Sequence, residues 1–348
     1  MGALSWFTGE CAAEQTGGPT YPTAPTRVSG KPMTNKIAVV GSGYMGGGIA
    51  QVLALAGARV ALTDVSAEVA QKNYDRLIAE SRDFVADGLF PEGATQTLQV
   101  NLWPANCIAE GVADADFIEE CVPEVLTIKR DILSQISAAA QVGAIIGSNT
   151  STISIGAMAT AVTNPDRFLG VHFSNPAPFI PGVEIIPHSG TADATVTRVS
   201  EIINAAGKTS AVIKDATGFV LNRLQYALFH EATQLVEEGV ATAEDIDTVV
   251  RTTFGFRLPF FGPFAIADMA GLDVYNFCYQ SLQSGFPERF ATPRILTELV
   301  AQGKLGTKSG GGFTDVPAER IPELIAYRNK AYMLMQKLLD DLGPAPTK

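Results

Sequence analysis

The stretch KIAVVGSGYMGGGIAQVLALAGARVALTD, residues 36–64, decides the fold of the first half of the chain. The apolar run Ile37–Val40 predicts a strand, and the glycines after it predict a tight turn followed by a helix to about Ala56. Gly57 ends that helix, and Arg59–Thr63 predicts a second strand. This order of elements is typical of the first unit of a doubly wound α/β sheet.

The glycines of this stretch form a GxGxxG pattern, and their spacing suits a dinucleotide. The first permits the turn, the second lets the backbone approach a pyrophosphate, and the third lets the helix pack on the strand. Asp64 ends the second strand, where a carboxylate binds ribose hydroxyls and repels a 2′-phosphate, so NAD is expected as the cofactor rather than NADP. The alternative is a nucleotide-free α/β unit with a chance match. The predicted contacts at the turn are Gly41, Gly43, Tyr44, Met45 and Gly46.

The rest of the chain predicts two domains. Strands at 115–123 and 143–151, separated by a helix at 128–142, continue the parallel sheet, whereas helices dominate from about Lys214 onward. The expected helices are 226–240, 243–254, 264–282 and a terminal helix from Ile321. We therefore expect an α/β Rossmann-like NAD-binding domain followed by a mainly α-helical domain. The expected boundaries are a flexible arm at 1–32, the NAD-binding domain at 33–213 and the helical domain at 214–348.

Charge and composition exclude several partners. With 25 Lys and Arg against 36 Asp and Glu, the formal net charge is −11, which disfavours nucleic acid and anionic membrane surfaces. No apolar run is long enough to cross a bilayer and the first thirty residues do not resemble a secretory signal, so a cytoplasmic location is expected. The four cysteines have neither CxxC nor metal-ligand spacing, which predicts reduced thiols and no metal site.

The segment HFSNPAPFIPGVEIIP, residues 172–187, holds a histidine and a glutamate among apolar residues. Oxidation of an alcohol with NAD needs a group that accepts the hydroxyl proton, and a histidine of pKa near ~6.5 suits that task. A carboxylate on the other ring nitrogen fixes the imidazole, as Glu184 could do for His172. The alternative for His172 is a hydrogen-bonded core histidine. His188 is expected at a loop surface and His230 in a helix.

The motifs taken together resemble the 3-hydroxyacyl-CoA dehydrogenase superfamily. They are GSGYMGGGIA, SNTS at 148–151, HFSNP at 172–176, Glu184, GFVLNRL at 218–224 and KSGGGF at 308–313. The resemblance implies that His172 and Glu184 are the catalytic pair, that Ser151 and Asn222 contact the substrate oxygen, and that the helical domain makes a homodimer. It also implies positions around the nicotinamide half of the cofactor, which are Glu124, Lys129, Asn175 and Lys308. Each of these four could instead be a surface charge or, for Asn175, a turn cap.

The sequence departs from the acyl-CoA enzymes of this family. Residues 65–100 carry three basic and six acidic side chains, a poor platform for the phosphates of CoA. The segment NPAPFIPGVE lacks the family's lysine, and FGFRLPFFGPF inserts Arg257. Both features resemble the branch that contains L-gulonate dehydrogenase and lambda-crystallin, L-carnitine dehydrogenase and a pyridine-carboxylate dehydrogenase of vitamin B6 breakdown. Arg257 could bind a substrate carboxylate through two parallel hydrogen bonds, or it could pair with an acidic residue at a helix end.

Three hypotheses follow. The first is an NAD-dependent dehydrogenase of a small hydroxy carboxylic acid, and the second is a 3-hydroxyacyl-CoA dehydrogenase. The third is a non-catalytic NAD-binding structural protein of the lambda-crystallin kind, against which the His172–Glu184 pair argues.

Overall fold

The structure is a computed structural model that describes residues 35–346. It forms two compact units, which divide between Tyr226 and Ala227. The arm expected at residues 1–32 lies outside the described residues. The domain boundary expected at 213/214 stays a prediction.

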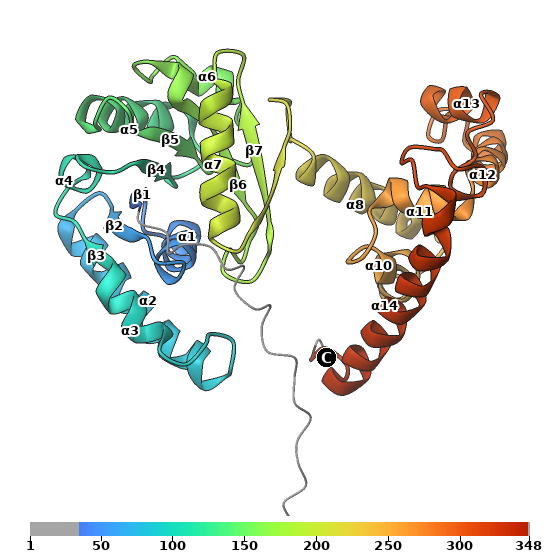
Figure 1. Ribbon diagram of the computed structural model, residues 1–348, viewed down its shortest axis with the longest axis horizontal. Helices are drawn as coiled ribbons and strands as arrows, with labels where there is room; N and C mark the ends of the chain where they lie inside the picture. Colours follow the sequence, from blue (N-terminus) through green and yellow to red (C-terminus); the bar gives the residue numbers. More distant parts are fainter. Residues whose placement is uncertain (1–34, 347–348) are drawn as a thin grey trace, which may run out of the picture. The chain divides into compact units, whose positions relative to one another are not determined.

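An eight-stranded sheet forms the centre of the first unit (Figure 1). Its strands lie in the order β3-β2-β1-β4-β5-β6-β7-β8, and neighbouring strands are parallel except for β6 and β7, which are antiparallel. The strands are β1 (Lys36–Val40), β2 (Arg59–Thr63), β3 (Leu102–Pro104), β4 (Phe117–Glu120), β5 (Ile145–Ser148), β6 (Phe168–Phe173), β7 (Gly182–Pro187) and β8 (Thr209–Val212). The predicted Rossmann-like fold is confirmed.

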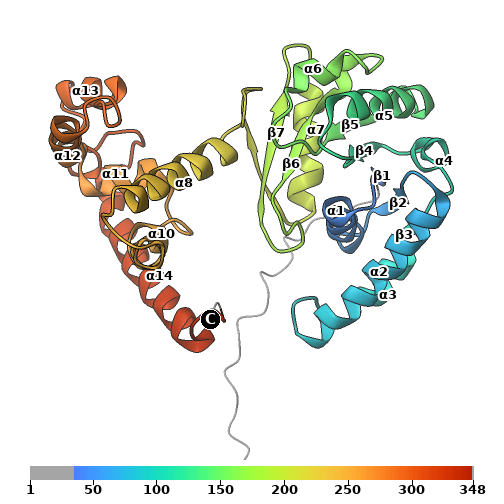
Figure 2. The same cartoon turned by 180° about the vertical axis from the view of Figure 1, so that it is seen from behind.

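Helices cover both faces of this sheet (Figures 1 and 2). One face carries α1 (Tyr44–Leu55), α2 (Ala67–Ala86), α3 (Ala94–Asn101) and α7 (Asp193–Ala205). The other carries α4 (Ile108–Val112), α5 (Leu126–Ala139) and α6 (Ile155–Ala159), with a short 3₁₀ turn η1 (Pro165–Arg167) before β6. Both faces of the central strands are therefore buried, which explains why these strands are nearly continuous apolar runs.

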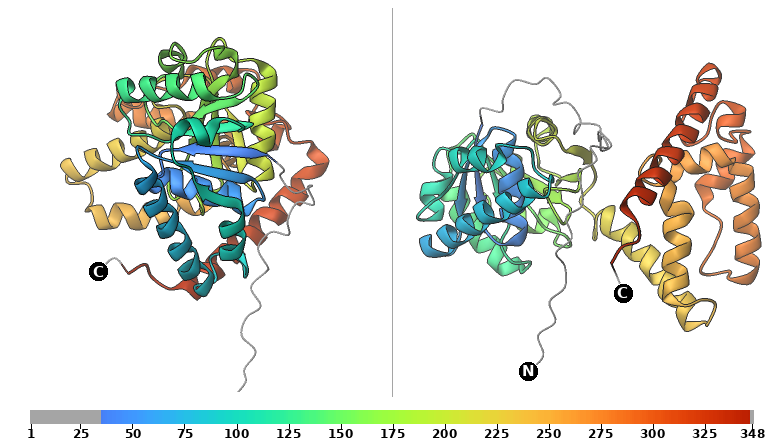
Figure 3. Two further views of the ribbon diagram at one scale, coloured as in Figure 1. Left: turned by 90° about the vertical axis from the view of Figure 1, so that its left-hand side faces the viewer. Right: turned by 90° about the horizontal axis from the view of Figure 1, so that it is seen from below.

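The second unit is helical (Figure 3). Its elements are α8 (Leu221–Glu237), which begins in the first unit, α9 (Ala243–Thr252), α10 (Phe254–Arg257), α11 (Pro263–Ala270), α12 (Leu272–Gly285), α13 (Arg294–Ala301), η2 (Thr307–Ser309), η3 (Ala318–Arg320) and α14 (Ile321–Leu342). The long terminal helix α14 packs on the segment around α10 through Tyr332, whose ring contacts the rings of Phe256, Phe260 and Phe261.

One predicted element differs. The single helix expected at 264–282 is two helices, α11 and α12, because Gly271 adopts φ +104° between them. That backbone angle is outside the helical region and favours glycine. Within residues 35–346, no helix is long and apolar enough to span a bilayer.

Candidate active site

His172 and Glu184 face one another across the antiparallel strands β6 and β7. The Nδ1 atom of His172 lies 2.8 Å from Oε2 of Glu184, and both side chains are largely buried. The other oxygen of Glu184 accepts hydrogen bonds from the backbone N–H groups of Val220 and Leu221, at 3.1 and 2.9 Å. Burial alone would raise the pKa of Glu184, but the bonds from His172 and from these amides outweigh it and hold the pKa below its usual value.

Ser151 and Asn222 lie beside this pair. The Nε2 atom of His172 is 3.2 Å from the Ser151 hydroxyl, and the amide of Asn222 donates to the Ser151 carbonyl at 2.8 Å. Ser151 comes from the loop after β5, and Asn222 from the first turn of α8. The structure thus brings together the four residues predicted to act on the substrate, although their chemical roles stay predictions.

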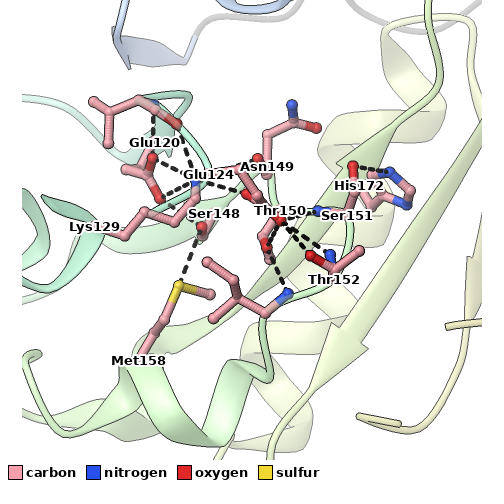
Figure 4. A network of polar contacts seen from close by, with 12 residues as sticks. Glu120, Glu124, Lys129, Ser148, Asn149, Thr150, Ser151, Thr152, Met158 and His172 are labelled. Carbon is pink, nitrogen blue, oxygen red and sulfur yellow. Dashed lines mark hydrogen bonds and ion pairs between the residues drawn. The ribbon is translucent and has the colours of Figure 1, made fainter. Parts of the chain in front are cut away.

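Glu124 holds the loop that carries Ser151 (Figure 4). One of its oxygens accepts hydrogen bonds from the Thr150 hydroxyl and from the backbone N–H groups of Ser151 and Thr152, at 2.7, 2.9 and 3.0 Å. Burial raises the pKa of Glu124, but these bonds and the charge of Lys129, 3.6 Å from the second oxygen, lower it overall. An ionised Glu124 therefore fixes the position of the serine that contacts His172.

Lys129 lies beside Glu124 and is fully buried. Its ammonium binds both oxygens of Glu120, at 2.8 and 3.2 Å, and the carbonyls of Val122 and Asn149. Glu120 also accepts a hydrogen bond from Ser148 at 2.5 Å. The family resemblance implied that Lys129 lies around the nicotinamide half of the cofactor, but no motif pointed to Glu120. The signal for Glu120 is a pair of glutamates, Glu119 and Glu120, inside an apolar strand.

The glycine turn is built as its pattern predicts. Gly41 has φ +100°, and a Cβ atom there would lie 2.6 Å from the carbonyl oxygen of Cys121. A Cβ at Gly46 would lie 1.8 Å from the Gly41 oxygen, so the start of α1 lies too close to the turn after β1 for a side chain. Open space surrounds Gly43, and no side chain caps the N-terminus of α1. This open, uncapped helix end fits a pyrophosphate, which the turn and the first amides of α1 would hold.

The other predicted cofactor residues are placed as follows. Asp64 lies directly after β2 and is half-buried, Tyr44 is exposed, and Met45 packs partly against the core. Asn175 is exposed in the turn after β6. Lys308 belongs to the helical unit, where it forms an ion pair with Asp273 and lowers the pKa of that carboxyl. Nothing in the structure assigns these side chains to the cofactor.

The parallel sheet and its glycine turn define a class of protein, the dinucleotide-dependent dehydrogenases. Comparison with known proteins agrees with this class. The family model described as 3-hydroxyacyl-CoA dehydrogenase, NAD binding domain, matches residues 36–216, and the model of the C-terminal domain matches residues 218–316. The chain belongs to the 3-hydroxyacyl-CoA dehydrogenase family.

Individual relatives come from two kinds of enzyme. A 5-formyl-3-hydroxy-2-methylpyridine 4-carboxylate 5-dehydrogenase of Mesorhizobium japonicum is 33% identical over 88% of this chain and 99% of its own. A 3-hydroxybutyryl-CoA dehydrogenase of Bradyrhizobium diazoefficiens is 35% identical over 80% of this chain and 94% of its own. Among solved structures, a 3-hydroxyacyl-CoA dehydrogenase of Archaeoglobus fulgidus has a TM-score of 0.72 at 32% identity, covering 89% of this chain and 99% of that chain. The protein is an NAD-dependent dehydrogenase that acts on hydroxyl groups.

Proposed function

We propose that the protein oxidises the alcohol of a small hydroxy carboxylic acid, with His172 as general base and NAD as hydride acceptor. The observation that carries the proposal is the contact of both His172 nitrogens, one with Glu184 and the other with Ser151. A relative that acts on a pyridine carboxylate, named above, also supports a small acid as substrate.

The tautomer of the neutral His172 ring follows from its partners. Ionised Glu184 only accepts hydrogen bonds, so Nδ1 of His172 carries a hydrogen and Nε2 of the neutral ring is the acceptor. Nε2 therefore takes the proton of the alcohol, and Glu184 stabilises the imidazolium that results. NAD, held by the glycine turn and the first amides of α1, would supply the hydride acceptor for this oxidation. Ser151 and Asn222 would hold the substrate oxygen in both directions of the reaction.

Arg257 is the proposed contact of the substrate carboxylate. None of the ion pairs that the structure gives among residues 35–346 involves Arg257, which supports a guanidinium available to a substrate carboxylate. Burial raises the pKa of the Tyr275 phenol, and the nearby charge of Arg257 partly offsets this rise. An arginine without a carboxylate partner can bind a free acid without first breaking an existing ion pair.

A 3-hydroxyacyl-CoA is the second candidate substrate, because several relatives are named for acyl-CoA substrates. The helices after β2 argue against it. Among residues 65–100 six side chains are acidic and three are basic, and one of the three, Arg76, is paired with Glu80 at 2.8 Å. Phosphate groups of CoA would meet a surplus of negative charge there.

The test is NADH formation with free hydroxy acids, including hydroxymethyl pyridine carboxylates, beside 3-hydroxybutyryl-CoA. Arg257→Met should raise the KM for a free acid at least tenfold, since a hydrogen bond to a charged group is worth ~1.5–3 kcal/mol. The exposed Arg251 of α9 offers a matched control, and Arg251→Met should leave that KM unchanged. Turnover of the CoA thioester alone, or an unchanged KM in Arg257→Met, contradicts the proposal.

His172→Gln tests the base itself. It should lower kcat by ~10² to 10⁴, the usual contribution of a general base, while NADH binding stays near normal. His188 is a control histidine. Its ring contacts the Pro165 carbonyl oxygen at 2.9 Å instead of the Ser151 hydroxyl. His188→Gln should keep the activity, and an equal loss in both variants would contradict the assignment of the base.

We also propose a homodimer. No side chain of the 17-residue helix α8 is buried within the chain, and large apolar side chains on it are exposed. They include Leu224, Tyr226, Leu228, Phe229 and Val236. A second copy would remove this surface from water. Light scattering of the purified protein should give twice the chain mass, and a monomer at micromolar concentration would contradict the proposal.

A further inference from the structure

Ser42 stands between the first two glycines of the turn and is fully buried, although the next two residues, Gly43 and Tyr44, are exposed. Its backbone N–H and its hydroxyl both donate to one oxygen of Asp64, at 2.7 and 2.5 Å. The other Asp64 oxygen accepts from the backbone N–H of Val65 at 2.8 Å. Three hydrogen bonds thus fix the plane of the carboxylate at the end of β2.

Helix α2 fixes the serine in turn. The amide nitrogen of Asn73 donates to the Ser42 hydroxyl at 2.8 Å. A hydroxyl has a single hydrogen, so while it accepts from Asn73 that hydrogen remains directed at Asp64. Arg76 donates to the Asn73 oxygen at 3.3 Å, which orients the amide, and Glu80 holds Arg76 by an ion pair at 2.8 Å.

We propose that Ser42, oriented by Asn73, is a positioning residue that fixes Asp64 and thereby sets the preference for NAD over NADP. The inference rests on the proposed role of Asp64 at the adenosine ribose. An ionised carboxylate offers about four acceptor sites and three are used, so one remains for a ribose hydroxyl, on the oxygen that accepts only from Val65. The 2′-phosphate of NADP would face a negative charge that cannot rotate away, whereas an unanchored carboxylate could turn toward solvent.

Binding of NADH and NADPH to the purified full chain, followed by nucleotide fluorescence, tests this without knowledge of the substrate. Ser42→Ala should weaken NADH binding about threefold to tenfold, the effect of one lost hydrogen bond on the geometry of a charged partner. Binding of NADPH should stay the same or tighten, so that the NADH/NADPH preference falls at least threefold. Asn73→Ala changes only the helix side of the network and should act in the same direction, more weakly.

Two further variants separate the possible outcomes. In an Asp64→Ala background, Ser42→Ala should change neither affinity by more than about twofold, because it acts through the carboxylate. The matched control is Ser81→Ala, a fully buried serine of α2 that bonds Ile78 and Thr95 instead; it should leave both affinities unchanged.

Equal loss of NADH and NADPH affinity in Ser42→Ala would overturn the inference, since a merely structural serine weakens both nucleotides alike. An undiminished effect of Ser42→Ala in the Asp64→Ala background would overturn it as well. If Asp64→Ala alone leaves the NADH/NADPH preference intact, the proposed role of Asp64 fails and the inference fails with it. If Asp64→Ala abolishes the preference while Ser42→Ala and Asn73→Ala keep it, only the inference fails.

Discussion

Glu119 of β4 is expected to destabilise the protein at neutral pH. Its side chain is fully buried on the sheet face opposite Glu120, and neither carboxyl oxygen has a hydrogen-bond partner among the described residues. Burial raises its pKa well above the usual value, and the charge of Glu120 adds to the rise. The carboxyl fits only because its neighbour across the sheet is Gly147, where a Cβ atom would lie 2.2 Å from Oε2.

Replacing this group by methionine should therefore stabilise the fold. Loss of the unpaired polar group is worth about 1–3 kcal/mol in Glu119→Met, because methionine has a similar volume and adapts to irregular space. A proton term adds to this. The unfolded carboxyl ionises near pH ~4.3, whereas the folded one keeps its proton, so stability falls by about 1.4 kcal/mol per pH unit from there up to the raised folded pKa.

Urea unfolding between pH 5 and pH 7 measures both terms. Glu119→Gln serves as the matched variant, because it keeps an unpaired polar group but cannot ionise. It should remove the decline of stability with rising pH that Glu119 causes, and Glu119→Met should remove the decline and also add the constant gain. A wild-type pH slope that persists in both variants, or a loss of stability in Glu119→Met, would refute the reasoning.

Three further predictions concern polar groups that organise backbone. Lys208 is buried, and its ammonium donates to three carbonyls of the β6–β7 connection, so Lys208→Met should lower the unfolding free energy by at least ~1.5–3 kcal/mol, as measured in urea. Glu184→Gln should reduce kcat less than His172→Gln does. It should also remove the stabilisation that the ionised Glu184 provides above pH ~4.3, so the melting temperature should fall more at pH 7 than at pH 4. Asp268→Asn removes the carboxylate that accepts three bonds from the 313–314 segment, so protease cleavage near 306–314 should become faster; an unchanged cleavage pattern would contradict its role.

Local patterns made much of the first unit predictable. The glycine turn and the two strands around it are encoded by neighbouring residues, as is the His172–Glu184 spacing within one hairpin. The edge strands β3 and β8 were not predicted, because three or four residues such as LWP or TSAV carry too little periodicity.

The burial of two lysines, Lys129 and Lys208, could not be predicted from the sequence. In the sequence, Lys129 looks like a surface residue of an amphipathic helix. Only the packing of α5 against the end of β4 places its ammonium between Glu120 and two backbone carbonyls. The same holds for Lys208, whose three carbonyl partners lie about thirty residues earlier in the chain. In both cases the partners are backbone carbonyls or, for Lys129, a glutamate on a strand outside its own helix, and no local pattern identifies them.

The antiparallel direction of β7 has a consequence for the order of assembly. His172 and Glu184 are 12 residues apart, so a single hairpin closes their contact at a small entropic cost. The contact between Ser151 and His172 spans 21 residues, and that between Asn222 and Ser151 spans 71. During folding the base can meet its carboxylate while the substrate-oxygen contacts are still unformed.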